Sequence, residues 1–160
     1  MLFSTSRKAG AKTRALARDL SYVIPRAAYL SRGKSSLEDV LDRARGHGHL
    51  LVGIIEESHG NPSMLHCIQC TDREWKRLAY CALSVHKLRK EFKSKKQRAA
   101  LLKLEFSLPQ FLAFFKKLGI ASQADADLVA KESNNTISFF EDGKEVGPRV
   151  SLGAIHYVQG

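Results

Sequence analysis

Residues 4–34 read STSRKAGAKTRALARDLSYVIPRAAYLSRGK, and this stretch decides how the rest of the chain is interpreted. It holds one acid, Asp19, and eight basic residues: Arg7, Lys8, Lys12, Arg14, Arg18, Arg26, Arg32 and Lys34. Ordinary solvated helices interleave acids with bases, because opposite charges four residues apart attract each other. The bias towards one sign therefore favours a surface that meets a polyanion, and a plain solvated helix face is the alternative.

The spacing of apolar residues predicts a helix from Arg7 to Ile24. At 100° per residue, an arc of about 120° collects Leu16, Ala17, Leu20, Val23 and Ile24. The opposite arc holds Arg7, Lys8, Arg14 and Arg18, with Lys12 at its border. Ser6 is the expected N-cap, and Pro25 ends the helix. One face should pack against the protein while the other presents a line of cations.

The charge of the whole chain agrees with a polyanionic partner. The formal net charge is +10 over 160 residues, and the hydrophobic content of 44% is enough for a globular core. Such a surplus indicates RNA, DNA or anionic lipid as the partner. Residues 121–147 run against this trend, with six acids and two lysines. That region suits a basic protein partner or plain solvent better than nucleic acid.

Targeting signals are not expected. No run of 18 apolar residues is present, so no membrane span is predicted. The N-terminus turns basic too early for a signal peptide, and the three cysteines then suggest a reducing compartment.

Apolar runs and turn residues predict an α/β fold with two similar halves, residues 1–75 and 76–160, each with a mixed sheet and helices. The first half is expected to hold a strand at 1–5, the basic helix, a strand at 27–31, a helix from Ser35 or Ser36 to Gly46, and strands at 49–56 and 64–70. The second half is expected to hold strands at 78–88 and 101–106, a helix at 108–118, a hairpin of 127–133 with 136–141, and a closing strand at 149–158. Asn134-Asn135 and Asp142-Gly143 tolerate the positive φ of tight turns.

Both ends of the sequence resemble the Brix-domain family of ribosome-biogenesis proteins. Thr5-Ser6-Arg7-Lys8, the basic helix and YLSRGKSSLEDV (29–40) are similar to the family's opening, and EVGPRVSLGAIHYVQG (145–160) is similar to its closing segment. The likeness is closest to the member that serves the small-subunit processome and to the short archaeal relatives. It implies a fold like a duplicated anticodon-binding domain of class IIa aminoacyl-tRNA synthetases. The middle departs from the family, because residues 71–75 (TDREW) stand where members often carry Gly-Pro-Thr.

The resemblance implies a ribosome biogenesis factor that binds ribosomal RNA precursors and assists rRNA processing or assembly without catalysis. Its implied partners are precursor ribosomal RNA and other ribosome-assembly proteins, with no membrane. The chain is expected to be a monomer, cytoplasmic if archaeal and nucleolar if eukaryotic. Two alternatives stay open: an RNA-processing enzyme, such as a nuclease or modifying enzyme, and an RNA-binding module associated with tRNA or its synthetases.

Two basic stretches, 7–34 and 87–98, are the expected RNA-binding site. Lysine and arginine contacts with phosphate release counterions and supply sequence-independent affinity, and arginine adds bidentate geometry. Serine and threonine hydroxyls and the free amides of the helix start add further phosphate donors. The expected RNA-binding residues are Ser4, Thr5, Ser6, Arg7, Lys8, Lys12, Arg14, Arg18, Arg32, Lys34, Lys87, Arg89, Lys90, Lys93, Lys95, Lys96 and Arg98. For 89–98 a solvated loop is the alternative.

Neither a metal or cofactor site nor a catalytic residue is expected. Cys67 and Cys70 form a C-x-x-C beside His66, but no second pair follows, and positions 67 and 70 of a strand point to opposite faces. Buried thiols are the better interpretation. No phosphate-binding loop and no G-x-S-x-G motif is present. Tyr22 and Tyr29 are expected at the edge of the core, whereas Trp75, in a polar loop, is a candidate for stacking on a base.

Overall fold

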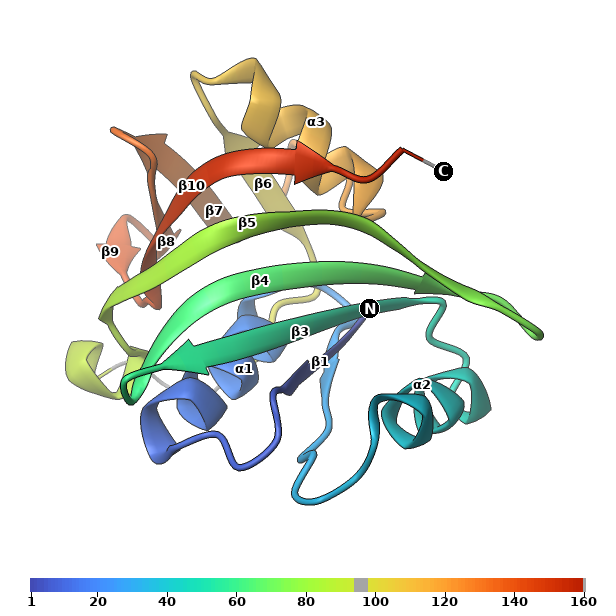
Figure 1. Cartoon of the computed structure of the whole chain (residues 1–160). Helices are drawn as coiled ribbons and strands as arrows, with labels where there is room; N and C mark the ends of the chain where they lie inside the picture. The colour runs from blue at the N-terminus through green and yellow to red at the C-terminus, as the bar shows by residue number, and fades with distance from the viewer. Residues whose placement is uncertain (94–97, 160) are drawn as a thin grey trace.

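The computed structural model describes residues 1–93 and 98–159, and its centre is one large mixed sheet (Figure 1). The strands are β1 (Leu2–Thr5), β2 (Ala28–Tyr29), β3 (Leu51–Ser58), β4 (Asn61–Cys70), β5 (Trp75–Lys87), β6 (Leu102–Glu105), β7 (Leu128–Ser133), β8 (Thr136–Glu141), β9 (Lys144–Glu145) and β10 (Arg149–Tyr157). The helices are α1 (Ala11–Val23), α2 (Leu37–Gly46) and α3 (Pro109–Lys117), with a short 3-10 helix η1 (Arg89–Phe92). The sheet order is β2-β1-β3-β4-β5-β10-β8-β7-β6, and β9 pairs with β8.

The same arrangement of strands occurs at both ends of the sheet, as the predicted fold of two similar halves requires. In the first half β1 lies parallel to β3, and β3, β4 and β5 are antiparallel neighbours. In the second half β6 lies parallel to β7, and β7, β8 and β10 follow in antiparallel order. The pairing of β10 with β5 joins the halves into one sheet. The boundary predicted after residue 75 assigns β5 (Trp75–Lys87) to the second half, whereas the repeated strand arrangement groups β5 with the first; the boundary itself stays a prediction.

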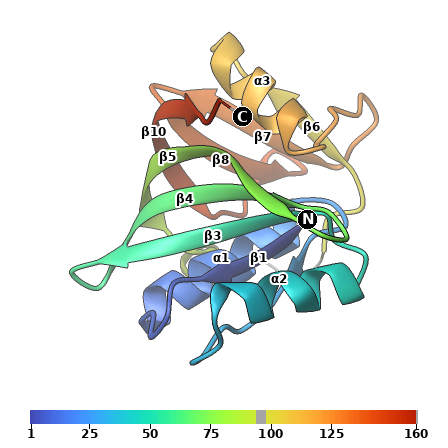
Figure 2. The same ribbon diagram turned by 45° about the vertical axis from the view of Figure 1, so that its right-hand side comes forward.

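Helices cover both faces of the sheet. Helices α1 and α3 contribute to one core cluster on one face, whereas α2 packs in a second cluster over β1 and β3 on the other. Ile55 and Ile54 of β3 belong to the two different clusters, so the prediction of a strand covered on both sides is confirmed. Figure 2 shows α3 beside β6 and β7, and α1 and α2 near β1 and β3. None of the described helices is long and apolar enough to cross a membrane.

The turn chemistry that the sequence indicated is confirmed at three places. Asn134 and Asn135 have φ of 50° and 61° between β7 and β8, and Asp142-Gly143 turns into β9 with φ of 50° and 74°. Ser36 caps α2 in a capping box, because its hydroxyl accepts from Asp39 N at 3.0 Å while the Asp39 carboxylate accepts from Ser36 N at 2.8 Å.

The N-termini of α1 and α3 are both capped by a side chain from another element of the fold. Neither helix has a capping side chain at its own N-cap, which is Gly10 in α1 and Leu108 in α3. A glutamate from the neighbouring region of the sheet takes this role: Glu57 of β3 accepts from Gly10 N at 2.8 Å, and Glu132 of β7 accepts from Leu108 N at 3.3 Å. Strands β3 and β7 are the parallel partners of the strands that precede each helix. In both halves, therefore, the helix that follows the first parallel strand is capped at its N-terminus in the same way.

Candidate nucleic-acid interface

Helix α1 starts four residues later than the sequence indicated. The N-cap is Gly10 and the first helical residue is Ala11, so Arg7 and Lys8 lie in the preceding turn, where Lys8 has φ of 55°. The prediction that Ser6 caps the helix is wrong. Its backbone N–H donates to the carbonyl of Ile55 at 2.9 Å and continues the β1–β3 ladder beyond Thr5.

A glutamate carboxylate of the protein itself occupies the N-terminus of α1, where a phosphate was predicted to bind. The Glu57 carboxylate accepts from Gly10 N at 2.8 Å and from the Thr13 hydroxyl at 2.5 Å. These hydrogen bonds, that from Thr13 first, lower the pKa of Glu57, so the carboxylate is ionised at neutral pH. A phosphate would meet like charge at this end of the helix, and the predicted anion site is therefore corrected to an internal cap.

The hydroxyls of the first strand are also engaged inside the protein. Ser4 and Thr5 are buried, with 0% and 3% of their surface exposed. The Ser4 hydroxyl donates to the carbonyl of Leu30 at 2.8 Å, and the Thr5 hydroxyl donates to the carbonyl of Ser6 at 3.1 Å. Ser4 ties β1 to the end of β2, so these two residues position the strand and do not face a ligand as predicted.

Most of the predicted cations of the first stretch do reach solvent. The exposed residues are Arg7, Lys8, Lys12, Arg14, Arg18 and Lys34. On α1, Arg14 donates to the carbonyl of Ala9 at 3.1 Å, and the Arg18 guanidinium lies 5.1 Å from the centre of the Tyr29 ring. Four residues apart on one helix, Arg14 and Arg18 point to the same side. The exposed side of α1 is therefore basic, as the helical spacing predicted.

The turn before α1 and the loop after β2 bring two more arginines close together. Arg32 is half-buried, and its guanidinium donates to the carbonyls of Thr5 at 3.1 Å and Ser35 at 3.2 Å. Burial lowers the pKa of Arg32, and the positive charge of Arg7 adds to this effect. Arg32 thus holds its loop against the end of β1 while keeping its charge near that of Arg7.

The second basic stretch divides into exposed and buried cations. Lys87, Lys90, Lys93 and Arg98 are exposed, whereas Lys95 and Lys96 lie outside the described residues. Arg89 is only 8% exposed, and its guanidinium donates to the carbonyl of Gly147 at 3.5 Å. Burial lowers the pKa of Arg89, and Asp19 is the first of the neighbouring groups that act against this shift. The prediction of Arg89 as an RNA contact is corrected, because its side chain fixes η1 to the core.

The two stretches meet at Tyr22 near the end of α1. The guanidinium carbons of Arg89 and Arg98 lie 5.6 and 5.2 Å from the centre of the Tyr22 ring. The carbonyl of Tyr22 accepts from Ala99 N at 2.8 Å, and Asp19 accepts from Arg89 N at 2.8 Å. Tyr22 is half-buried, as its predicted place at the core edge requires, but its role as the junction was missed. No local pattern signals a contact between residues some 70 positions apart.

In the described part of the chain, the exposed cations of both stretches form no direct ion pair with an acid, although the Glu57 carboxylate lies near Arg14 and the Asp39 carboxylate near Arg7. The ion pairs of Arg45, His66, Lys103, Lys131 and Arg149 include none of these exposed cations, whereas the buried Arg89 interacts with Asp19. Lys12 donates to an uncharged partner, the side-chain oxygen of Asn61, at 2.8 Å. A surface with uncompensated positive charge attracts polyanions. The charge argument made from the sequence therefore holds for the described part of this surface.

The cysteines and Trp75 occupy structural positions. Cys67 and Cys70 pack in different core clusters, so the prediction that they point to opposite faces is confirmed, and burial raises the pKa of Cys67. Cys81 is also buried, with its pKa raised to about 12 by burial. Trp75 is 39% exposed, and its indole N–H donates to Glu38 of α2 at 2.6 Å. This bond ties β5 to α2, while a stacking role for the ring stays a prediction.

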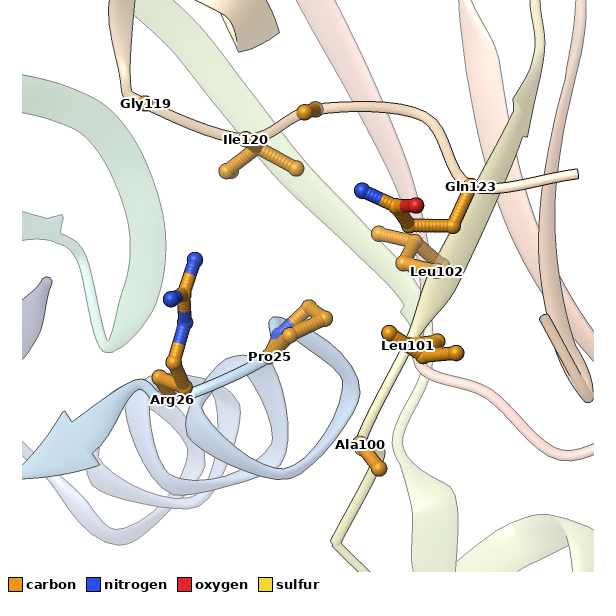
Figure 3. A pocket seen from close by; sticks show the side chains of 9 residues that line it. Pro25, Arg26, Ala100, Leu101, Leu102, Gly119, Ile120 and Gln123 are labelled. Carbon is orange, nitrogen blue, oxygen red and sulfur yellow. The ribbon is translucent and has the colours of Figure 1, made fainter.

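A cavity of about 330 Å³ lies where the two halves meet, between the end of α1, the start of β6 and the loop after α3 (Figure 3). Its described lining residues are Pro25, Arg26, Ala100, Leu101, Leu102, Gly119, Ile120, Ala121 and Gln123. Arg26 is the one charged side chain among them, and they include neither a carboxylate nor a histidine, serine or cysteine. Among its described lining residues the cavity thus offers neither a nucleophile nor an acid–base pair.

Comparison with known proteins gives relatives of one kind. No protein-family model matches the chain. It is 30% identical over 131 residues to a Pyrococcus horikoshii protein named "Probable Brix domain-containing ribosomal biogenesis protein", an alignment that covers 82% of this chain and 57% of that protein. A Thermococcus kodakarensis protein of the same name is 29% identical over 131 residues, with 82% and 61% covered. The chain therefore spans less than two thirds of the length of these two relatives.

Solved structures agree on the fold. A probable ribosomal biogenesis protein from Aeropyrum pernix K1 superposes with a TM-score of 0.79 at 23% identity, covering 95% of this chain and 94% of that one. The archaeal Imp4-like protein Mil gives a TM-score of 0.75 at 23% identity, with 99% and 100% covered. The likeness to anticodon-binding domains stays a prediction. The identity to relatives named for the Brix domain, the fold of the solved structures and the two terminal motifs agree. The chain belongs to the Brix-domain family.

Proposed function

We propose that this chain is a ribosome biogenesis factor that holds precursor ribosomal RNA on the basic surface around α1 and does so without catalysis. The observation that carries the proposal is the set of exposed cations on α1 and the adjoining loops, none of which forms a direct ion pair within the described residues. Rigid elements position them, because α1 is packed on the sheet and capped by Glu57. Phosphate contacts from such a surface give affinity and orientation without reading sequence.

The opposite end of the sheet is proposed to meet other assembly proteins. Strands β7, β8 and β9 lie within the acidic region 121–147, far in sheet order from β1 and α1. Of its acids, Glu132 is buried and Glu145 is paired with Arg149, whereas Asp125 and Asp142 are exposed. Exposed carboxylates repel RNA and attract a basic protein segment. The two ends of the molecule would then hold an RNA and a protein partner at the same time.

An enzyme and a tRNA-associated module are the rival functions, and each has a direct test. Incubating the protein with labelled RNA and a divalent metal ion distinguishes a nuclease, which would turn the RNA over, from a scaffold, which would leave it intact. Crosslinking in cell extract followed by sequencing of the bound RNA distinguishes ribosomal RNA from tRNA. The proposed function predicts intact RNA in the first experiment and ribosomal sequences in the second.

Replacing Arg14 and Arg18 together with Ala is expected to weaken RNA binding and to reduce the slope of log affinity against log salt by about two, one unit for each lost phosphate contact. Both side chains are exposed on α1, so the fold should be unaffected. The measurement is a series of binding titrations between low and moderate salt. An unchanged slope would show that these arginines do not contact phosphate.

The matched control for this variant is Lys116→Ala with Lys144→Ala. Both lysines are exposed, one on α3 and one on β9, at the other end of the sheet. The control removes the same two charges and lowers the net charge from +10 to +8, as the double arginine variant does. Equal losses in both variants would mean that binding follows net charge and is not located at α1.

A further inference from the structure

The short helix η1 is held between α1 of the first half and a turn of the second half. On the α1 side, Arg89 N donates to the Asp19 carboxylate at 2.8 Å, and the Arg89 guanidinium carbon lies 5.6 Å from the centre of the Tyr22 ring. On the other side, the Arg89 guanidinium donates to the carbonyl of Gly147, in the turn between β9 and β10, at 3.5 Å. The position of η1 therefore depends on contacts with both halves of the fold.

Phe92, the last residue of η1, packs against the backbone of this turn. A Cβ added to Gly147 would lie 2.4 Å from Cε2 and 2.5 Å from Cδ2 of the Phe92 ring, so the ring fills the space that a side chain at position 147 would need. Gly147 also has a φ of 65°, which glycine adopts without strain. Glycine at this position therefore allows the ring to approach the turn closely.

Two cations from the strands that join the halves lie over the Phe92 ring. Lys87 is the last residue of β5 and Arg149 the first of β10, and the two are partners in the β5–β10 pairing. Lys87 Nζ lies 5.6 Å and the Arg149 guanidinium carbon 5.7 Å from the centre of the ring, distances at which a cation is attracted to an aromatic ring. Arg149 Nε also donates to Glu145 at 2.8 Å, and Lys87 lies near the same carboxylate. Phe92 thus anchors η1 at the junction of the two halves.

The cations that this anchored segment presents to solvent are Lys90 and Lys93. Within the described residues, neither forms a direct ion pair with an acid. Glu91, the acid of η1, accepts from Leu88 N at the start of the helix. Lys90 lines a cavity of about 170 Å³ together with Arg18 of α1, so the cations of η1 lie beside those of α1. An RNA that reaches both elements meets more positive charge than either element offers alone.

We propose that η1 and α1 form one RNA-binding surface across the two halves, and that Phe92 is the residue that positions η1 for it. The inference rests on the proposed RNA-binding function and goes further, because it assigns a role in RNA binding to a side chain that holds the cations and to the turn that receives it. A lysine on a loose segment must be ordered when RNA binds, and this ordering lowers the affinity. Anchoring η1 removes that cost for Lys90 and Lys93.

The test compares Phe92→Ala with the double variant Lys90→Ala, Lys93→Ala in titrations of a synthetic RNA hairpin at several salt concentrations. The double lysine variant is expected to reduce the slope of log affinity against log salt by about two, one unit for each lost phosphate contact. Phe92→Ala leaves the net charge unchanged and should still reduce the slope by at least about one. The triple variant should bind no more weakly than the double lysine variant, because residues that act through one another are not additive.

Phe140→Ala is the matched control. Phe140 of β8 is half-buried like Phe92, and its ring also carries a cation, with Lys131 Nζ 5.2 Å from the ring centre. It lies in the strand next to β7, towards the other end of the sheet. Phe140→Ala should lower the midpoint of thermal unfolding about as much as Phe92→Ala does and leave the salt slope at the wild-type value. The same reduction of the slope in both variants would assign the effect to lost stability and overturn the positioning role.

The remaining outcomes separate the inference from the function on which it rests. A wild-type slope in Phe92→Ala, or additive losses in the triple variant, would overturn the positioning role and leave the proposed function standing. A wild-type slope in the double lysine variant would overturn the joint surface. If the wild type does not bind the hairpin, the proposed function fails, and the inference fails with it.

Phe92→Leu covers the case in which Phe92→Ala does not fold. Leucine keeps apolar volume next to Gly147 but removes the ring that Lys87 and Arg149 contact. Folded Phe92→Leu is expected to show a smaller salt slope than the wild type, with the thermal midpoint close to the wild-type value. Folded Phe92→Leu with the wild-type slope would overturn the role of the ring.

Discussion

Replacing Phe114 with Ala is expected to lower the free energy of unfolding by about 3–5 kcal/mol and to shift the unfolding of both halves together. Phe114 of α3 is 1% exposed, and it lines a small apolar cavity of about 40 Å³ together with Leu20 of α1 and Ile24, the residue that follows α1. One side chain of the second half thus supports the helix that carries the basic surface of the first half. For a chain of this length the midpoint of thermal unfolding should fall by on the order of 10 °C.

Fluorescence of the only tryptophan allows the unfolding of the first half to be followed separately. Trp75 reports on the contact between β5 and α2 in the first half, far from the site of the substitution on α3. Its fluorescence transition should move by the same amount as the helical signal in circular dichroism. Leu112→Ala is the control, because Leu112 is 39% exposed on α3 and should shift the midpoint only slightly. A Trp75 transition that stays at the wild-type midpoint would show that the halves unfold independently.

The sequence predicted the elements well, because their signals are local. Asn134-Asn135 specifies a tight turn through its own backbone preference, and Ser36 with Asp39 specifies a helix start within four residues. The apolar spacing within α1 depends on no distant residue either. Such features are decided within one turn of helix or one hairpin, so a single sequence is sufficient to read them.

The errors occurred where a distant residue decides the outcome. Ser6 has the side chain of a good N-cap, but the carbonyl of Ile55 engages its N–H and extends the strand. Arg89 stands in a basic run, but it is buried against Tyr22 and the carbonyl of Gly147. Composition around position 89 resembles that of a solvated loop, and no local pattern distinguishes a structural arginine from its exposed neighbours. The candidate site was therefore predicted correctly as a region and less well residue by residue.

Replacing Glu132 with Ala should destabilise the protein by about 2–3 kcal/mol, because four part-buried hydrogen bonds lose their shared acceptor. Glu132 is 9% exposed and accepts from the Ser107 hydroxyl at 2.5 Å, from Ser107 N at 3.2 Å and from Leu108 N at 3.3 Å, while its other oxygen accepts from Asn135 N at 3.2 Å. One carboxylate thus caps α3 and fixes the turn between β7 and β8. Urea unfolding at neutral pH measures the loss.

The dependence on pH identifies the carboxylate charge as the source of this stability. The Ser107 hydroxyl, followed by the amides of Asn135, Ser107 and Leu108, lowers the pKa of Glu132 in the folded state. A lowered folded-state pKa means that the stabilisation is complete above the ordinary glutamate range, near pH 4, and is lost as the pH falls through the folded value. The difference between wild type and Glu132→Ala should therefore shrink in acid. A difference that is constant down to pH 2 would assign the effect to lost packing.

The equivalent glutamate of the first half should behave in the same way but with a smaller effect. Glu57 is half-exposed and accepts from two donors, Gly10 N and the Thr13 hydroxyl, so Glu57→Ala should cost about 1 kcal/mol, the value typical of a lost helix cap. Its stabilisation should disappear over the same acidic range, because hydrogen bonding also lowers the pKa of Glu57. If Glu57→Ala cost more than Glu132→Ala, the number of donors that each carboxylate serves would not explain the capping of these helices. The expected result is a larger effect at Glu132. It would show that helix capping by a glutamate contributes more to stability in the second half than in the first half, which carries the basic surface.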